Sequence, residues 1–206
     1  IGSGAGKLIL FGEHAAVYGH PAVGISLPER TVVELQGEGR EEWALGAVDP
    51  EDRRAVEATL SRLEALVPEL TASGRASVRI HSEVPRGTGF GSSAALCVAL
   101  AEAALSHAAS RAAGTSHRIP PAPDTAGPAN SVVWHLAHEL ERLFHGTPSG
   151  IDTGLSLLGG LRAFSPRPPA LPETEPLPGV PLRLVVGAVP RAGNCGALVA
   201  ELGRRV

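Results

Sequence analysis

Apolar residues in the first part of the chain are spaced as in β-strands. A short apolar run covers residues 7–11, and after a Gly-Glu-His turn a second extended stretch reaches residues 30–35. Residues 76–83 alternate between apolar and polar, which predicts a half-buried strand that ends in a Val-Pro-Arg-Gly turn. We expect the first two stretches to pair as neighbouring strands of one sheet.

Three further segments have the periodicity of helices. The first begins at Asp49-Pro50, with Asp49 as its N-cap, and extends to about Leu70. The second covers residues 92–110, and its first half is apolar on every side, which predicts that it is buried within the domain. The third covers residues 131–145 and carries one apolar stripe, with Glu141 at its margin.

The last part of the chain predicts a change of domain. Residues 155–164 have the pattern of a strand with a bulge or hairpin turn at a Gly-Gly pair. A strand at 182–189 and the start of a helix at Cys195 are too few elements to bury a core of their own. We therefore expect a first domain at 1–165, a proline-rich linker at 166–181 and the incomplete start of a second domain at 182–206.

The charge and cysteine content exclude several classes of function. The 206 residues carry a net charge of −3, so no broad basic surface predicts nucleic acid or an anionic membrane as a partner. Cys97 and Cys195 lie far apart and outside any Cys-x-x-Cys motif, which argues against a disulfide framework and a zinc site. No apolar run reaches the roughly 18 to 20 residues that span a bilayer. We expect a cytoplasmic protein, and a homodimer remains open.

A glycine-rich loop precedes the buried helix, with the residues Gly87, Thr88, Gly89, Phe90, Gly91, Ser92 and Ser93. Backbone N–H groups and a helix N-terminus in this setting can hold a phosphate, and glycines let the main chain approach it closely. Ser92 can cap the helix, while the hydroxyl of Ser93 is available to a phosphate-bound metal. The alternative is an ordinary turn with a serine N-cap, which the strand-to-helix context makes the weaker interpretation.

Gly2 to Lys7 is a second glycine-rich stretch, but it does not match a Walker A loop. That motif needs four residues between its first glycine and the Gly-Lys pair, and then Ser or Thr followed by a helix. Here Leu8 follows Lys7, and a strand follows Leu8. By itself, Lys7 is more typical of a solvated surface charge.

Two carboxylates, Glu141 and Asp152, lie on either side of the sequence His-Gly-Thr-Pro-Ser-Gly-Ile at 145–151. In phosphoryl transfer one carboxylate can hold magnesium while another accepts the proton of the attacking hydroxyl. Taken alone, Asp152 is more typical of a turn residue or helix cap. His135 and His138 are three residues apart on a predicted helix, and without a third ligand we expect solvated side chains rather than a metal site.

Three motifs in order resemble those of the mevalonate kinase family of the GHMP kinase superfamily. Residues 6–19, Gly-Lys-Leu-Ile-Leu-Phe-Gly-Glu-His-Ala-Ala-Val-Tyr-Gly, resemble the first motif, and the loop at 87–94 is similar to the second. Residues 145–152 resemble the aspartate loop, which homoserine kinases lack. The resemblance covers essentially the whole chain and extends into the start of the family's C-terminal domain.

The resemblance implies an ATP- and Mg²⁺-dependent kinase that transfers the γ-phosphate of ATP to the 5-hydroxyl of mevalonate. Asp152 would be the base, and Lys7 would lie near the reacting hydroxyl and the γ-phosphate. Glu13 and His14 would lie on the substrate side, together with Lys7 and Asp152.

The metal site and the fold are implied in the same way. Ser93 and Glu141 would bind Mg²⁺, and the backbone of 87–92 would hold the phosphates of ATP. The implied fold is α+β with a left-handed βαβ unit, followed by a ferredoxin-like C-terminal domain of which only the start is present. We expect the third superfamily motif beyond Val206.

Some positions depart from the family pattern, and two alternatives stay open. Ala5 stands where proline is usual, and the threonine expected near the start of the second domain is missing from 192–195. Another isoprenoid kinase, such as a phosphomevalonate kinase, would need extra basic residues for the substrate phosphate, and few candidates are visible. A catalytically silent ligand sensor would have no need of the base Asp152.

Overall fold

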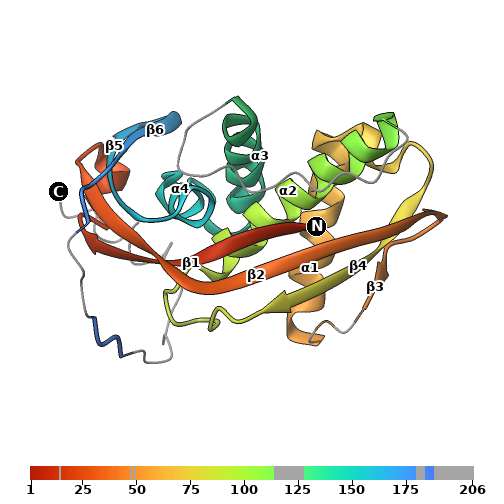
Figure 1. Ribbon diagram of the computed structural model, residues 1–206, viewed down its shortest axis with the longest axis horizontal. Coiled ribbons are helices and arrows are strands. Elements are labelled where there is room, and N and C mark those ends of the chain that lie inside the picture. The colour runs from red at the N-terminus through yellow and green to blue at the C-terminus, as the bar shows by residue number, and fades with distance from the viewer. Residues whose placement is uncertain (14, 47, 49, 114–127, 180–183, 188–206) are drawn as a thin grey trace.

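The computed structural model describes residues 1–206 except 14, 47, 49, 114–127, 180–183 and 188–206 (Figure 1). The described elements are β1 (Gly2–Phe11), the 3₁₀-helix η1 (Ala16–Tyr18), β2 (Ala22–Arg40), β3 (Ala44–Leu45), α1 (Pro50–Leu66), the 3₁₀-helix η2 (Pro68–Thr71), β4 (Arg75–Ser82), α2 (Ser92–Ala113), α3 (Pro128–His145), α4 (Ile151–Leu158), β5 (Leu161–Arg167) and β6 (Ala170–Pro176). The predicted α+β class is confirmed: one mixed sheet has helices α2, α3 and α4 on one side (Figure 1).

Strand β2 is the centre of the sheet. The strand order is β3-β4-β2-β5-β6, and β1 also pairs with β2 in antiparallel register, as predicted for the first two strands. Residues 31–33 of β2 pair with both β1 and β4, and residues 23–25 pair with both β1 and β5. Strands β4 and β5 therefore share one edge of β2, and β1 occupies the other.

The pairing of β1 with β2 is interrupted between Ala5 and Lys7. Ala5 pairs with Arg30 but Lys7 pairs with Ser26, so the register shifts at this point. The backbone N–H of Lys7 donates instead to the carbonyl of Phe90, at 2.9 Å. Because a bulge redirects the side chains next to it, this irregularity ties Lys7 to the glycine-rich loop.

The glycines at the start of β1 bring this strand against the backbone of α2. A Cβ at Gly2 would lie 2.1 Å from the carbonyl oxygen of Ala99, and one at Gly4 would lie 2.2 Å from that of Ala95. These distances leave no room for a side chain. The stretch that is not a Walker A loop is therefore a packing surface between strand and helix.

Helix α2 forms the middle of the core, as its apolar sequence predicts. Its residues Ala94, Ala95, Cys97, Val98, Ala99, Leu100 and Ala101 are fully buried. Among the described helices, α2 is long and apolar enough to span a membrane by length and composition, but 56% of the window Ser92–Arg111 is buried inside the fold. We interpret it as the core helix of the domain, which packs against β1, β2 and α3.

The first helix is shorter than predicted. Helix α1 ends at Leu66, not near Leu70, and Val67 has a non-helical backbone with φ −133° and ψ 75°. Pro68 explains the end, because proline disfavours the α conformation in the residue before it and cannot donate to the preceding turn. A separate 3₁₀-helix, η2, follows and buries Leu70.

Two predictions for the later part of the chain are wrong. The strand expected from residue 155 is the helix α4 up to Leu158, and strand β5 begins only at Leu161, after Gly159 and Gly160. A short apolar run does not by itself distinguish a buried helix from a buried strand, which explains the error.

The stretch predicted as a linker contains strand β6, which pairs with residues Arg162 to Arg167 of β5. Its prolines, Pro172 and Pro176, are tolerated because β6 is the last strand in the order of the sheet. Half of the strand expected at 182–189 and the whole helix expected from Cys195 lie outside the described residues. The four described residues 184–187 belong to no strand and are exposed.

Candidate active site

Lys7 and Asp152 form an ion pair at the centre of the site. Lys7 Nζ lies 2.9 Å from Asp152 Oδ2, and the two side chains are 5% and 26% exposed. The lysine is therefore not the solvated surface charge that is typical of an isolated lysine. The pair brings the first strand of the chain to the first turn of α4, as expected from the family resemblance.

The geometry of α4 determines where Asp152 lies. Gly150, with a φ of +80°, precedes the helix, and its carbonyl accepts hydrogen bonds from Trp134 Nε1 at 3.0 Å and Thr153 Oγ1 at 3.1 Å. At Gly154 a Cβ would lie 2.6 Å from Trp134 Cζ2, so α4 packs directly on the indole. These contacts hold the first turn of α4, and Asp152 with it, against α3.

Lys7 keeps its charge in spite of its burial. Burial is the largest single influence and lowers the pKa of Lys7, but the charge and hydrogen bond of Asp152, with a smaller contribution from Glu13, raise it above its ordinary value. The ammonium group is therefore protonated at neutral pH. Asp152 also contributes to the environment of Glu141, so Lys7, Asp152 and Glu141 form one group of charges.

Glu141 is a buried carboxylate without a hydrogen-bond donor. Its side chain is 1% exposed, and within the described residues neither of its oxygens accepts a hydrogen bond. Burial, and then the charge of Asp152, raise its pKa well above the ordinary value, while Lys7 acts in the opposite direction. An unpaired buried carboxylate is costly, so this group indicates a site for a cation rather than a stabilising contact.

His145 connects Glu141 with Ser93. Its Nε2 lies 3.3 Å from Ser93 Oγ and 3.9 Å from Glu141 Oε1. Ser93 is in the first turn of α2, and Glu141 is one turn before His145 in α3. The structure thus brings the two predicted metal ligands near the same nitrogen of one imidazole. In the part of the chain that the structure describes, no group of three or more His, Cys, Asp and Glu side chains could hold a metal ion.

The glycine-rich loop has the conformation that its glycines allow. Gly87, Gly89 and Gly91 have φ values of +68°, +87° and +77°, which residues with a side chain rarely adopt. Between them, Thr88 donates its hydroxyl to the carbonyl of Pro85 at 3.0 Å, and Phe90 accepts from the Lys7 backbone. The loop leads directly into α2, so the predicted strand-loop-helix arrangement is present.

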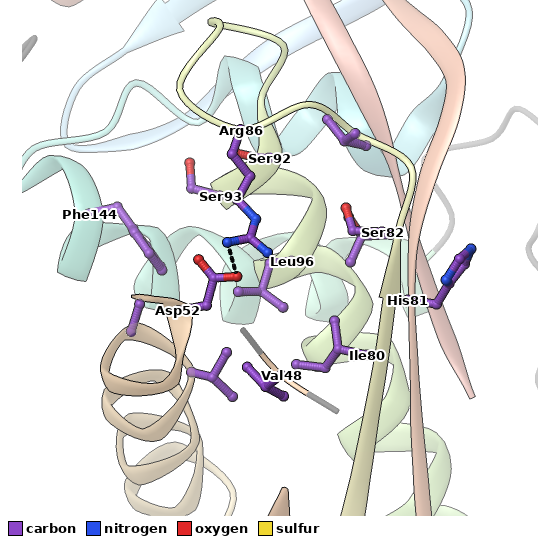
Figure 2. Close-up of a pocket in the computed structure, with 14 residues that line it drawn as sticks. Val48, Asp52, Ile80, His81, Ser82, Arg86, Ser92, Ser93, Leu96 and Phe144 are labelled. Carbon is purple, nitrogen blue, oxygen red and sulfur yellow. Dashed lines mark hydrogen bonds and ion pairs between the residues drawn. The ribbon is translucent and has the colours of Figure 1, made fainter. Parts of the chain in front are cut away.

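A cavity of about 600 Å³ lies beside this loop. Figure 2 shows Arg86, which directly precedes the loop, extended past the first turn of α2 toward Asp52 of α1, with which it forms an ion pair. Val48, Ile80 and Leu96 line the cavity on the side away from the loop (Figure 2). It therefore has a polar end at the loop and an apolar end between α1, β4 and α2.

The loop connects this cavity to the Lys7–Asp152 pair, which does not line it. Ser92 and Ser93 line the cavity, and they follow Gly91 directly. Gly91 contacts the aliphatic part of Lys7, because a Cβ there would lie 2.6 Å from Lys7 Cγ. Residues 91–93 of the loop therefore separate a molecule in the cavity from the Lys7–Asp152 pair.

The remaining predicted residues have different outcomes. Glu13 is exposed and close enough to Lys7 to raise its pKa, whereas His14 lies outside the described residues. The prediction for His138 is wrong, because it is 6% exposed and packs near Gly150. His135 is exposed, as predicted, and its Nδ1 lies 2.8 Å from the carbonyl of Ser131.

Sequence reasoning missed the residues that make the cavity and connect it to the site. Arg86 and Asp52 lie in a turn and in the first turn of a helix, where charged residues are common and carry no signal. The sequence places Phe144 on the apolar stripe of its helix, and nothing in that pattern indicates that it lines a cavity. His145 belongs to the aspartate loop, and its place one turn after Glu141 is the signal that could have identified it.

Comparisons with known proteins show which family the chain resembles. The family described as GHMP kinases N terminal domain matches residues 53–160, more than half of the chain. The chain is similar to the mevalonate kinase of Thermococcus gammatolerans, with 30% identity over 99% of this chain and 61% of that protein. It is also similar to the mevalonate kinase of Arabidopsis thaliana, with 29% identity over 97% of this chain and 65% of that protein.

Solved structures share the fold. The L. major mevalonate kinase in complex with R-mevalonate matches with a TM-score of 0.56 and 24% identity, over 85% of this chain and 51% of that one. The Methanococcus jannaschii mevalonate kinase matches with a TM-score of 0.60 and 18% identity, over 86% and 55%. The chain thus spans about three fifths of the curated relatives it matches. From the family match over more than half of its length, we conclude that the chain belongs to the GHMP kinases and contains their N-terminal domain.

Proposed function

We propose that the protein is an ATP-dependent kinase that transfers the γ-phosphate of ATP to the 5-hydroxyl of mevalonate, in isoprenoid biosynthesis. One observation carries the proposal: Lys7 and Asp152 meet at 2.9 Å beside the glycine-rich loop of a GHMP kinase domain. The curated relatives named above are mevalonate kinases, which favours mevalonate as the alcohol.

In the proposed reaction Asp152 acts on the attacking alcohol. Its carboxylate accepts the proton of the 5-hydroxyl as the oxygen bonds to the γ-phosphorus, and the bond from that phosphorus to the bridging oxygen breaks to release ADP. Lys7 is charged and directed at the same point, so its ammonium stabilises the negative charge that develops on the transferred group and holds Asp152 in place. Glu13, near Lys7, would contact the alcohol substrate together with His14.

The cavity and loop are proposed to hold ATP. The apolar end of the cavity, with Val48, Ile80 and Leu96, suits the adenine ring. The polar end of the cavity adjoins the loop and the first turn of α2. Backbone N–H groups at a helix N-terminus favour phosphate, and the positive φ of the loop glycines lets the chain approach it closely. Ser92 and Ser93 lie where the phosphates would pass toward Lys7.

Glu141 and Ser93 would hold Mg²⁺. Their oxygen atoms are the ligands that Mg²⁺ prefers, and the buried carboxylate of Glu141 accepts no hydrogen bond from the described residues. Two protein ligands suffice, because Mg²⁺ in kinase sites usually completes its shell with water and substrate phosphates. When bound there, the ion would neutralise charge on the phosphates of the nucleotide.

The alternatives are less well supported. A phosphomevalonate kinase shares the fold, since the Streptococcus pneumoniae enzyme matches with a TM-score of 0.53 and 17% identity, but fold similarity does not decide the substrate. A silent sensor would not need the Lys7–Asp152 pair next to a buried, unpaired Glu141. We further propose that the protein acts in the cytoplasm on small molecules.

Incubation of the full-length protein with mevalonate, ATP and Mg²⁺ tests the proposal. We expect phosphomevalonate and ADP, and we expect Asp152→Asn to bind ATP like wild type while turnover falls by orders of magnitude. No turnover of mevalonate with brisk turnover of another alcohol would refute the substrate. Wild-type turnover by Asp152→Asn would refute the role of the base.

A further inference from the structure

Arg86 is the cation at the polar end of the cavity. It comes just before the glycine-rich loop, lines the cavity with Ser92 and Ser93, and forms an ion pair with Asp52 of α1 (Figure 2). The pair joins two elements on either side of the same cavity. Nothing in the proposed reaction uses either residue.

We propose that Arg86 binds the phosphates of the nucleotide, and that Asp52 holds its guanidinium at the cavity until the phosphates take over from the carboxylate. The ligand class is a nucleoside polyphosphate. The guanidinium is planar and presents several donors, so it can bind two phosphate oxygens at once, which suits an exchange of one oxyanion for another. The inference rests on the proposed function insofar as the ligand is ATP.

The exposure of the pair makes the exchange feasible. The side chains of Arg86 and Asp52 are 47% and 33% exposed, and half-exposed ion pairs contribute little to stability because water screens them. A triphosphate carries several negative charges, whereas Asp52 carries one. Separation of the pair therefore costs little compared with what the phosphates gain.

The position of Arg86 argues against a purely structural role for its ion pair with Asp52. Gly87 follows Arg86 directly, and a Cβ at Gly87 would meet nothing within 4 Å, so the loop is open at this point. The Arg86 side chain lines the cavity, and its guanidinium points toward Asp52 (Figure 2). A residue that served only to fix the loop would have no reason to line the space beside the helix N-terminus.

Calorimetric titration of the full-length protein with MgATP and with adenosine tests the inference. We expect Arg86→Gln to weaken ATP binding about tenfold, the effect of one charge-assisted hydrogen bond, and to leave adenosine binding within about twofold of wild type. We expect Asp52→Asn to bind ATP as tightly as wild type or about two- to threefold tighter, because the competing carboxylate is gone.

A second ion pair on the same helix provides matched controls. Arg53 and Glu57 of α1 form a half-exposed pair that does not line the cavity, so Arg53→Gln and Glu57→Gln should leave ATP binding unchanged. Equal losses of ATP binding in Arg86→Gln and Asp52→Asn would identify a structural tether and overturn the inference. Wild-type ATP binding by Arg86→Gln would also overturn the inference. If Arg86→Gln does not fold, Asp52→Asn decides: unchanged or tighter ATP binding supports the inference, and weaker ATP binding overturns it. A wild-type protein that binds no ATP would overturn the proposed function and this inference together.

Discussion

The side chain of Lys7 crosses the space that a side chain at Gly91 would need. A Cβ built at Gly91 would lie 2.6 Å from Lys7 Cγ and 2.9 Å from Lys7 Cε. The backbone N–H of the same lysine bonds to Phe90, so both its main chain and its side chain are fitted to the loop. The charge at the proposed reaction centre and the loop proposed to hold phosphate are thus parts of one packed unit.

Substitution of Gly91 should therefore damage the site as well as the fold. We expect Gly91→Ala to lower the free energy of unfolding by about 2–4 kcal/mol, since a strained φ and a displaced Lys7 add together. The matched control is Gly87→Ala, which has a similar φ but open space around it and should cost only about 1 kcal/mol. Chemical denaturation measures both, and equal losses would show that the contact with Lys7 is unimportant.

Removal of the Lys7 charge should strongly lower turnover and change how stability responds to alkaline pH. We expect Lys7→Met to lower kcat by about 10²–10³-fold, as for other groups that stabilise charge in a transition state. Asp152 would then lack its partner, and because it is partly exposed we expect a loss of only about 1–2 kcal/mol in stability.

The pH dependence follows from the raised pKa of Lys7. The native lysine holds its proton more tightly than the unfolded one, so its contribution to stability is complete below the ordinary value of 10.5 and is lost as the pH rises through the native pKa. Denaturation between pH 8 and 12 should show a fall in wild type that is absent from Lys7→Met. Parallel curves would contradict the assignment.

The carboxylate of Glu141 should lower the stability of the cation-free protein and strengthen cation binding. We expect Glu141→Gln to stabilise the cation-free protein by about 1–2 kcal/mol, because a buried, unpaired carboxylate becomes neutral. The same substitution should weaken activation by Mg²⁺ at least tenfold. Glu139→Gln, on the same helix and already paired with Arg142, is the control that should do neither. A less stable Glu141→Gln protein would show that the carboxylate has a partner that we have not recognised.

His145 should affect the metal site through Ser93. We expect His145→Ala to weaken Mg²⁺ activation about tenfold, in the range measured for residues that orient metal ligands, and His145→Gln to restore part of it by contacting Ser93. Direct titration of Mn²⁺ gives a readout besides activity. His135 is exposed, and its imidazole contacts the carbonyl of Ser131 on its own helix, so His135→Ala should leave Mn²⁺ binding unchanged.

The extent to which the sequence predicts this structure differs from element to element. The strands β1 and β2 and the helix α2 follow from periodicity, because apolar residues of β2 and α2 share the main core cluster and Ile9 of β1 packs against a second one. Helix α4 did not, since Ile151 to Leu158 is short and apolar and its helical state depends on Gly150 and on packing against Trp134. Strand β6 was hidden by its prolines, which an edge position tolerates.

The site divides in the same way. The meeting of Lys7 and Asp152 was expected because the motifs that contain them resemble those of one family, not because their spacing indicates it. The burial of Glu141 could not be read from its position at the margin of an apolar stripe, since the side of α3 that it covers depends on α2 and α4. The cavity combines residues from α1, β4 and α2, and no local pattern reports such a combination.

The nineteen-residue strand β2 has a consequence for how the protein tolerates change. It aligns β1, which carries Lys7, and β5, which follows Asp152, along its opposite edges over the same residues 23–25. A single inserted residue in that stretch would change the register of β1 and β5 against β2, whereas a side chain at Gly37, near the outer end of β2, would meet nothing within 4 Å. Insertions and deletions among related sequences should therefore be common near Gly37, at the outer end of β2, and rare at residues 23–25.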